Sequence, residues 1–86
     1  MKIFYHGTSS DNFWRIMKYG FRGNVSITPD FECALSYTDS YRGRYNKKNV
    51  ISLLIKKGSK QTPTKDKLAG ERVYRAEDLI ILKRKG

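Results

Sequence analysis

Short apolar runs alternate along the chain with segments in which apolar residues recur every three or four positions. The β-branched and aromatic run at residues 3–5 is typical of a strand. Residues 10–19 place apolar side chains on one helical face, and Gly20 follows where a helix would end. A hydroxyl at Thr8 and an acid at Asp11 fit a capping box before this helix. The pattern therefore predicts a first strand at 3–5 and a first helix at 10–19.

A second strand and a second helix are predicted next. The short apolar segment 24–27 lies between a glycine and a proline, which favours a strand. Thr28 offers a hydroxyl cap, Pro29 fits the first helical position, and Asp30 adds an acid near the positive end of the helix dipole. Apolar residues then recur at spacings of three and four, which predicts a helix over 29–37.

The second half of the chain favours strands separated by polar loops. Residues 38–48 are polar and contain a glycine, which predicts an exposed loop. Residues 50–55 form the most apolar run and predict a central strand. Residues 56–70 form a long basic loop, and loops of this length in small domains are usually functional or disordered. Further strands are predicted at 72–74 and 79–82.

The predicted order, strand-helix-strand-helix and then three strands, indicates one α+β domain over residues 1–86. A chain of 86 residues buries only ~60–65% of its unfolded surface, and folds of ~200 residues such as a complete (β/α)8 barrel are excluded. Apolar residues make up 38% of the chain and aromatic residues 13%, which is enough for a packed core and argues against wholesale disorder.

The sequence also bears on compartment and metal binding. The sequence contains no window of ~18 apolar residues, the length needed to span a membrane. Its first residues lack the apolar stretch of a secretion signal. The single cysteine, Cys33, has no disulfide partner, lacks basic sequence neighbours and is interpreted as a small hydrophobe. One Cys and one His do not make an ordinary zinc site. We expect a cytoplasmic protein without a metal, of a size and basicity that suit a phage or toxin system acting in a host cytoplasm.

The net charge of +10 is unevenly distributed. Residues 1–40 carry four Lys or Arg and four Asp or Glu, whereas residues 41–86 carry fourteen and four. Such a field attracts nucleic acid, acidic proteins or phosphorylated ligands, but a lysine-rich surface without a specific ligand has the same composition. Tyr41 and Tyr45 lie among the basic residues, where aromatic rings either stack on bases or anchor a loop. The residues assigned to acceptor or polyanion binding are Arg42, Arg44, Lys47, Lys48, Lys56, Lys57 and Lys60.

Two residues are candidates for chemistry. His6, the single histidine, follows the first predicted strand beside Gly7, which lets a ligand approach the backbone closely. Together with the helix start that follows, this is either an anion or ribose site or the setting of a structural histidine. Glu71 starts a strand after the basic loop, where a carboxylate either pairs with a cation or stabilises an oxocarbenium-like transition state. No phosphate-binding glycine motif supports ATP hydrolysis or Rossmann dinucleotide binding.

Three sets of residues occur in order: Phe4-Tyr5-His6-Gly7-Thr8 with a helix ending at 16–21, then Val25-Ser26-Ile27-Thr28-Pro29-Asp30 leading to Ala34 and Tyr37, and finally 70–74 followed by 79–82. Together they resemble the NAD-binding core of the ADP-ribosyltransferases. The resemblance is to the diphtheria-toxin-like and poly-ADP-ribose-polymerase-like branch and to the small bacterial rifampin-modifying transferases. It covers residues 3–37 and 50–82. It implies a minimal ADP-ribosyltransferase-like fold, with two N-terminal helices packed on a small, largely antiparallel split β-sheet.

The resemblance implies a role for each matching residue. His6 would hydrogen-bond a ribose hydroxyl of NAD+, and Gly7 would hold the carboxamide through its backbone. Tyr37 would stack on the nicotinamide ring. Glu71 would bind the ribose and stabilise the cation that forms as the glycosidic bond breaks. The leaving group is already a cationic pyridinium, so orientation and charge stabilisation matter more than a strong acid.

Thr8 and Ser26 complete the NAD-binding set that the resemblance implies. Ser26 stands where this branch usually has a tyrosine, and a serine is closer to the arginine-modifying branch, which begins with Arg instead of His6. The implied activity is transfer of ADP-ribose from NAD+ to an anionic protein or nucleic acid. The alternatives are an inactive module that holds such a partner through the basic C-terminal half, and an RNA 2′-phosphotransferase-like enzyme, whose family shares His-Gly-Thr.

Overall fold

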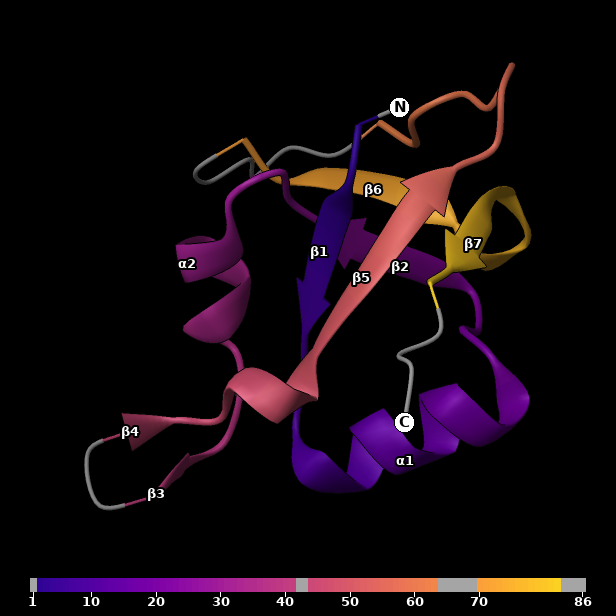
Figure 1. Ribbon diagram of the computed structural model, residues 1–86. Helices are drawn as coiled ribbons and strands as arrows, with labels where there is room; N and C mark the ends of the chain where they lie inside the picture. Colours follow the sequence, from indigo (N-terminus) through magenta and orange to yellow (C-terminus); the bar gives the residue numbers. More distant parts are fainter. Residues whose placement is uncertain (1, 42–43, 64–69, 83–86) are drawn as a thin grey trace.

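The computed structural model describes residues 2–41, 44–63 and 70–82 (Figure 1). Its helices and strands are, in chain order, β1 (Phe4–Gly7), α1 (Ser10–Tyr19), β2 (Asn24–Ile27), α2 (Phe31–Leu35), β3 (Ser40–Tyr41), β4 (Arg44–Tyr45), the 3-10 helix η1 (Lys47–Asn49), β5 (Val50–Ile55), β6 (Arg72–Arg75), the 3-10 helix η2 (Ala76–Asp78) and β7 (Leu79–Ile81). Within these ranges the prediction of an α+β domain with two α-helices is confirmed. The predicted basic loop and the end of the chain fall partly outside them, at residues 64–69 and 83–86.

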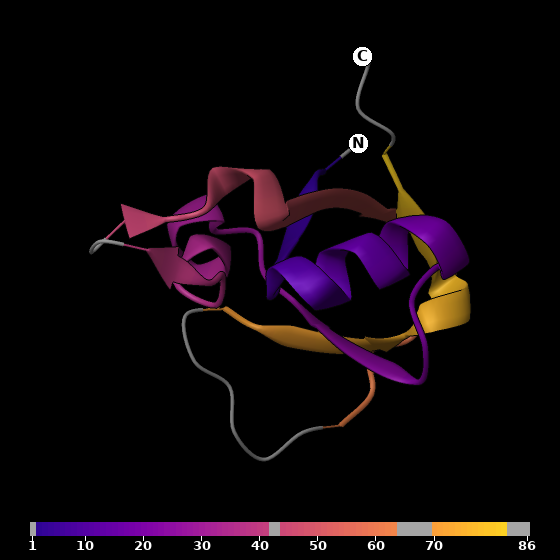
Figure 2. The same ribbon diagram turned by 90° about the horizontal axis from the view of Figure 1, so that it is seen from below.

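The strands form two principal antiparallel sheets. β5 lies between β1 and β7 in a three-stranded sheet, and β2 pairs with β6 in a two-stranded sheet. A bridge between Tyr5 and Thr28, with N–O distances of 2.8 and 3.0 Å, connects the two sheets. Figures 1 and 2 show α1 covering one end of the sheets and α2 beside β1. The β1 and β2 strands therefore meet at the point where His6 and Ser26 lie.

The hydrophobic core lies between the two sheets. Phe4, Leu53 and Leu79 come from the larger sheet, and Val25 and Ile27 come from the smaller one. Leu53 is fully buried and Ile27 is 1% exposed, so the alternate residues of β2 and β5 face inward. The predicted central position of the strand at 50–55 is confirmed, because β5 has a neighbour on each side.

The start of α1 differs from the predicted capping box. The Ser9 hydroxyl, instead of that of Thr8, caps the helix by accepting a hydrogen bond from the Asn12 N–H at 3.3 Å. Thr8 is buried, and its N–H donates to the Asn49 carbonyl. The predicted range of the helix and its end at Gly20 are confirmed, because the Gly20 N–H donates to the Ile16 carbonyl at 2.7 Å.

The second helix is shorter than the predicted 29–37. Asp30 is its cap and accepts hydrogen bonds from the N–H groups of Glu32 and Cys33. At the other end, the hydroxyls of Ser36 and Thr38 donate to carbonyls three residues earlier, at 2.6 and 2.8 Å. Such side-chain bonds compete with helix hydrogen bonding, so α2 ends at Leu35 and the chain continues in tight turns through Tyr37.

The segment predicted as a loop at 38–48 forms a short hairpin, β3 and β4, followed by η1. Its base is tied to the start of α1. The Ser10 N–H donates to the Asp39 carboxylate at 2.9 Å, and the buried Asn49 side chain donates to the Ser10 hydroxyl at the same distance. The hairpin extends from the body of the domain below α2 (Figure 1). Among the described residues, no helix has the length and apolar character needed to cross a membrane.

Candidate active site

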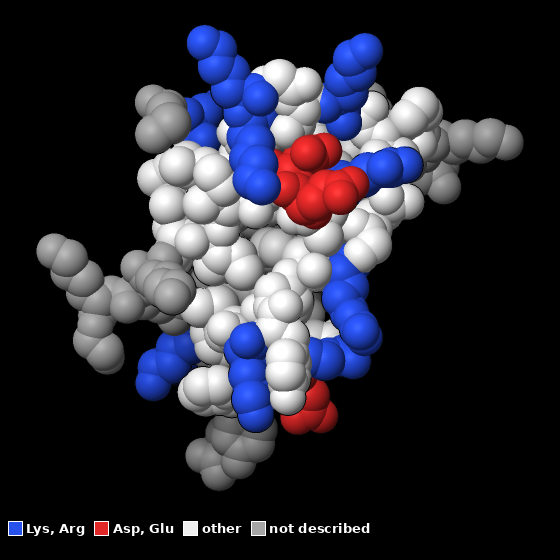
Figure 3. All heavy atoms as spheres, turned by 90° about the vertical axis from the view of Figure 1, so that its right-hand side faces the viewer, with Lys and Arg blue, Asp and Glu red and all other residues white. Residues whose placement is uncertain are grey.

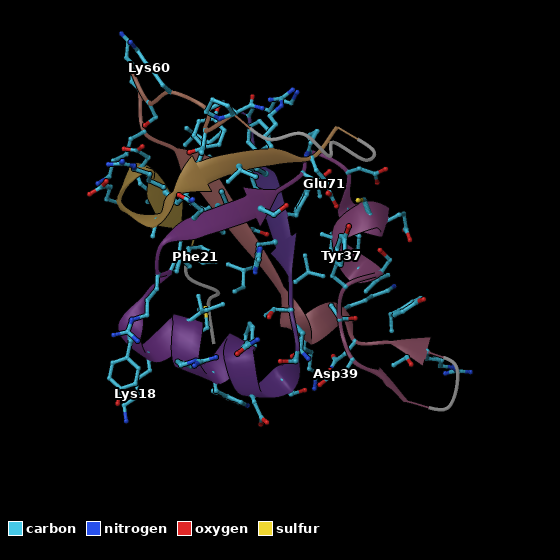
Figure 4. The ribbon with its side chains drawn as sticks, turned by 180° about the vertical axis from the view of Figure 1, so that it is seen from behind. Lys18, Phe21, Tyr37, Asp39, Lys60 and Glu71 are labelled. Carbon is cyan, nitrogen blue, oxygen red and sulfur yellow. The ribbon has the colours of Figure 1, made fainter. Side chains whose placement is uncertain are left out.

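A small cavity of about 170 Å³ lies between β1, β2 and α2. Five of the six residues that the resemblance assigned to NAD+ line it, namely His6, Gly7, Ser26, Tyr37 and Glu71. They come from both sheets, from the turn after α2 and from the residue before β6. Figure 4 shows Tyr37 and Glu71 on the same side of the molecule, one above the other. Residues that are far apart in the sequence thus meet in one place.

Gly7 allows β1 to lie directly against α2. A Cβ atom at this position would lie 1.6 Å from the backbone oxygen of Ala34, so no side chain fits there. Ala34 is itself buried. The glycine therefore sets the distance between the strand that carries His6 and the helix that precedes Tyr37.

His6 is held in one orientation and one tautomer. Its Nδ1 lies 2.6 Å from the Ser26 carbonyl oxygen, which can only accept a hydrogen bond, so Nδ1 carries the proton and Nε2 is left as an acceptor. The ring packs edge-on against Phe21 at 5.2 Å between centroids. Burial lowers the pKa of His6 below 6.5, and the bond to Ser26 offsets this in part. His6 is therefore neutral at pH 7, with Nε2 as a hydrogen-bond acceptor.

The lowered pKa of His6 predicts a pH-dependent contribution to stability. Because the unfolded chain binds this proton more readily, the contribution is complete above pH 6.5 and is lost as the pH falls through 6.5 to the lower folded-state pKa. We expect the free energy of unfolding, measured with urea from pH 7.5 to about 5, to fall less in His6→Asn than in the wild type. Parallel curves for the two proteins would contradict the assigned neutral state.

Glu71 receives two hydrogen bonds from residues of α2 and the turn that follows it. The Tyr37 hydroxyl donates to Glu71 Oε1, and the Cys33 thiol donates to the same oxygen at 3.6 Å. The bond to Glu71 raises the pKa of Tyr37 to about 12. Burial, and then the Glu71 carboxylate, raise the pKa of the Cys33 thiol. The interpretation of Cys33 as merely a small hydrophobe misses this contact, because nothing near Cys33 in the sequence points to Glu71.

A larger cavity of about 720 Å³ adjoins the small one, since His6 and Ser26 line both. Thr8, the sixth predicted NAD-binding residue, lines this larger cavity. So do Arg15 and Arg22, which sequence analysis did not single out. Their part of the chain has no net charge, yet the cavity wall carries two cations. The sequence does contain a signal for this wall of the cavity. Asn12, Arg15 and Tyr19 follow one another at the helical spacings of three and four, and all three line the cavity.

The predicted polyanion-binding residues do not form one surface. Arg44, Lys47 and Lys48 lie on the hairpin and η1, whereas Lys56, Lys57 and Lys60 follow β5. Figure 4 shows Lys60 on the opposite side of the molecule from Asp39, which precedes the hairpin. Figure 3 shows Lys and Arg side chains spread over one face, with acidic side chains among them. Arg42 lies outside the described residues, and the side chain of Tyr41 is likewise not described.

The 3-10 helix η2 carries two acidic residues, Glu77 and Asp78. Glu77 pairs with Arg75 at 3.5 Å, and both side chains are about 70% exposed. Neither acid lines the small cavity. Among the described residues, no three His, Cys, Asp or Glu side chains gather as metal ligands would.

Comparisons with protein-family models, with curated proteins and with solved structures found no match to this chain. Function is therefore inferred from the residues of the two cavities.

Proposed function

We propose that the protein is a mono-ADP-ribosyltransferase that takes NAD+ as its substrate. The observation that carries this proposal is the meeting of His6, Gly7, Ser26, Tyr37 and Glu71 around one small cavity. A split pair of antiparallel sheets with α1 and α2 beside them is consistent with a minimal ADP-ribosyltransferase-like fold, which is part of the same proposal. This reaction needs a carboxylate, a histidine that accepts a hydrogen bond from a hydroxyl group, and an aromatic ring.

In this proposal the two cavities hold the two halves of NAD+. A cavity of about 150 Å³ holds a benzene ring, so the small cavity of about 170 Å³ has room for one nicotinamide ring against Tyr37. The larger cavity lies within the ~300–1,000 Å³ range of small-molecule sites. Arg15 and Arg22 give it the charge that a diphosphate requires. His6 and Ser26 stand between the two cavities, where the ribose would lie.

The reaction requires stabilisation of a sugar cation. The bond between C1″ of the ribose and the pyridinium nitrogen breaks, and its electron pair neutralises the ring, which leaves as nicotinamide. The acceptor forms a new bond to C1″ and loses a proton to solvent. In this scheme His6 Nε2 accepts a hydrogen bond from a ribose hydroxyl, and Glu71 binds the ribose with a negative charge beside the developing cation.

The proposal is tested by incubating the protein with NAD+ labelled in its adenine half, alone and with a cell lysate. Nicotinamide release, followed by chromatography, reports cleavage of the glycosidic bond, and label on protein or nucleic acid reports transfer. We expect both. If NAD+ stays intact with and without the lysate across a range of pH and salt, the proposal is wrong.

The cations of the larger cavity give a binding prediction. Replacing Arg22 by alanine is expected to weaken binding of ADP-ribose about tenfold or more, because hydrogen bonds to charged groups contribute ~1.5–3 kcal/mol. Binding of nicotinamide should stay unchanged, because Arg22 does not line the small cavity. Calorimetric titration with each ligand measures both. Arg44→Ala is the matched control, and an equal loss of ADP-ribose affinity in that variant would contradict the assignment.

A second candidate function is polyanion binding by the hairpin and η1, where exposed Arg44, Lys47 and Lys48 lie beside half-exposed Tyr45. We expect affinity for a single-stranded RNA to fall steeply between about 50 and 200 mM salt, because bound phosphates release counterions. Replacing Arg44 and Lys48 by glutamate should reduce the salt slope by about 1.4, or ~0.7 per phosphate contact. Lys56→Glu with Lys57→Glu is the control at the other end of the molecule. Affinity that does not change with salt would exclude this function.

A further inference from the structure

We propose that Tyr37 and Cys33 position Glu71 for catalysis, by binding one oxygen of its carboxylate and leaving the other for the ribose. This inference rests on the proposed function. Both residues donate to Oε1, Tyr37 from its hydroxyl and Cys33 from its thiol at 3.6 Å. Tyr37 and Cys33 are then positioning residues, and Tyr37 also contributes its ring to the wall of the small cavity.

The positions of Tyr37 and Cys33 follow from the local structure of the chain around α2. They are four residues apart on one segment, Cys33 in α2 and Tyr37 in the tight turns that follow it, and both side chains reach Glu71 Oε1. Asp30 fixes the start of this segment as its cap, and Gly7 allows its close packing on β1. The Cys33 thiol also interacts with the side chain of Thr28, which is 3% exposed and belongs to the bridge between the sheets. The donors are therefore anchored to the core, although Tyr37 itself is 53% exposed.

Such anchoring matters because a glutamate side chain is long and rotates freely in water. Ordering it costs rotamer entropy, and here that cost is met on folding, before substrate binds. Fixing Oε1 also fixes the direction of Oε2. The lone pairs of Oε2 are therefore already oriented toward the ribose when the substrate binds. The raised pKa of Tyr37, about 12, and the raised pKa of Cys33 keep both groups protonated at neutral pH. They therefore act as hydrogen-bond donors to Glu71 at neutral pH.

The contact itself can be tested without turnover. In protein labelled with ¹³C at the tyrosine ring carbons, the resonance that disappears in Tyr37→Phe identifies Tyr37. At about pH 11, where ordinary tyrosines with a pKa near 10 are ionised, this resonance should remain that of the protonated form. In Glu71→Gln it should ionise at a lower pH than in the wild type. Ionisation of Tyr37 together with ordinary tyrosines in the wild type would overturn the proposal.

The positioning role is tested by kinetics of nicotinamide release. Tyr37→Phe keeps the ring and removes the hydroxyl, so kcat should fall about tenfold while KM for NAD+ changes less than about twofold. Cys33→Ala should lower kcat about threefold, and Cys33→Ser, which retains a donor, should restore most of it. An unchanged kcat in Tyr37→Phe, or a change in KM alone, overturns the positioning role and leaves the proposed function standing. No nicotinamide release by the wild type overturns the proposed function and this role with it.

Discussion

Replacing Glu71 by glutamine is expected to lower the rate of nicotinamide release by about 10²–10³-fold, the loss seen when one electrostatic stabiliser of a transition state is removed. Glutamine has nearly the same shape, and its carbonyl oxygen still accepts a hydrogen bond from the Tyr37 hydroxyl. The change therefore removes the negative charge beside the developing sugar cation and little else. Binding of NAD+ should weaken far less than kcat falls, because the substrate carries its positive charge on the leaving ring and not on C1″.

Two glutamates serve as controls for this substitution. Glu77 also flanks β6, but it is exposed, pairs with Arg75 and does not line the cavity. Glu32 lies on the exposed side of α2 and controls for a general loss of negative charge near the site. Glu77→Gln and Glu32→Gln should both release nicotinamide within about twofold of the wild-type rate. A similar large loss in either control, or full activity in Glu71→Gln, would contradict the role given to Glu71.

Much of the fold follows from local patterns. The range of α1 is predicted because its apolar residues repeat with the helical period and a glycine ends it. The strand at 50–55 is predicted because six consecutive largely apolar residues are too few for a buried helix. The end of α2 is not predicted, because the Ser36 and Thr38 hydroxyls compete for its last carbonyls and their choice depends on the surrounding structure.

The candidate site likewise contains residues that the sequence predicts and residues that it does not. His6, Gly7 and Glu71 could be singled out because they stand at the ends of predicted strands, where ligands meet the backbone. The contact between Cys33 and Glu71 could not, because 38 residues separate them and only the packing of α2 brings them together. Charge shows a related limit. The formal charges of the first 40 residues sum to zero, yet Arg15 and Arg22 of this part line one cavity. The net charge of a stretch of sequence therefore says little about the charge at a site.

Gly7 connects the fold to the site, so its replacement by alanine is expected to have the largest effect on stability. The new Cβ would lie 1.6 Å from the Ala34 carbonyl oxygen and 2.6 Å from its carbonyl carbon. Both are backbone atoms, so no side-chain rotation relieves the overlap and α2 has to move away from β1. We expect a loss of at least about 3 kcal/mol in the free energy of unfolding, the upper end of what overpacking usually costs. Urea denaturation measures it.

A glycine elsewhere separates this steric effect from a general cost of alanine. Gly58 has a φ of +87° and open space around it, so Gly58→Ala should cost only the ~1–2 kcal/mol of a left-handed alanine and leave the site unchanged. Adding Ala34→Gly to Gly7→Ala should not restore stability, because the overlap is with the backbone of residue 34 and not with its methyl group. Movement of α2 would also carry Tyr37 and Cys33 away from Glu71, so the folded fraction of Gly7→Ala should lose the raised Tyr37 pKa. A stability loss no greater than that of Gly58→Ala would show that β1 and α2 are not in this close contact.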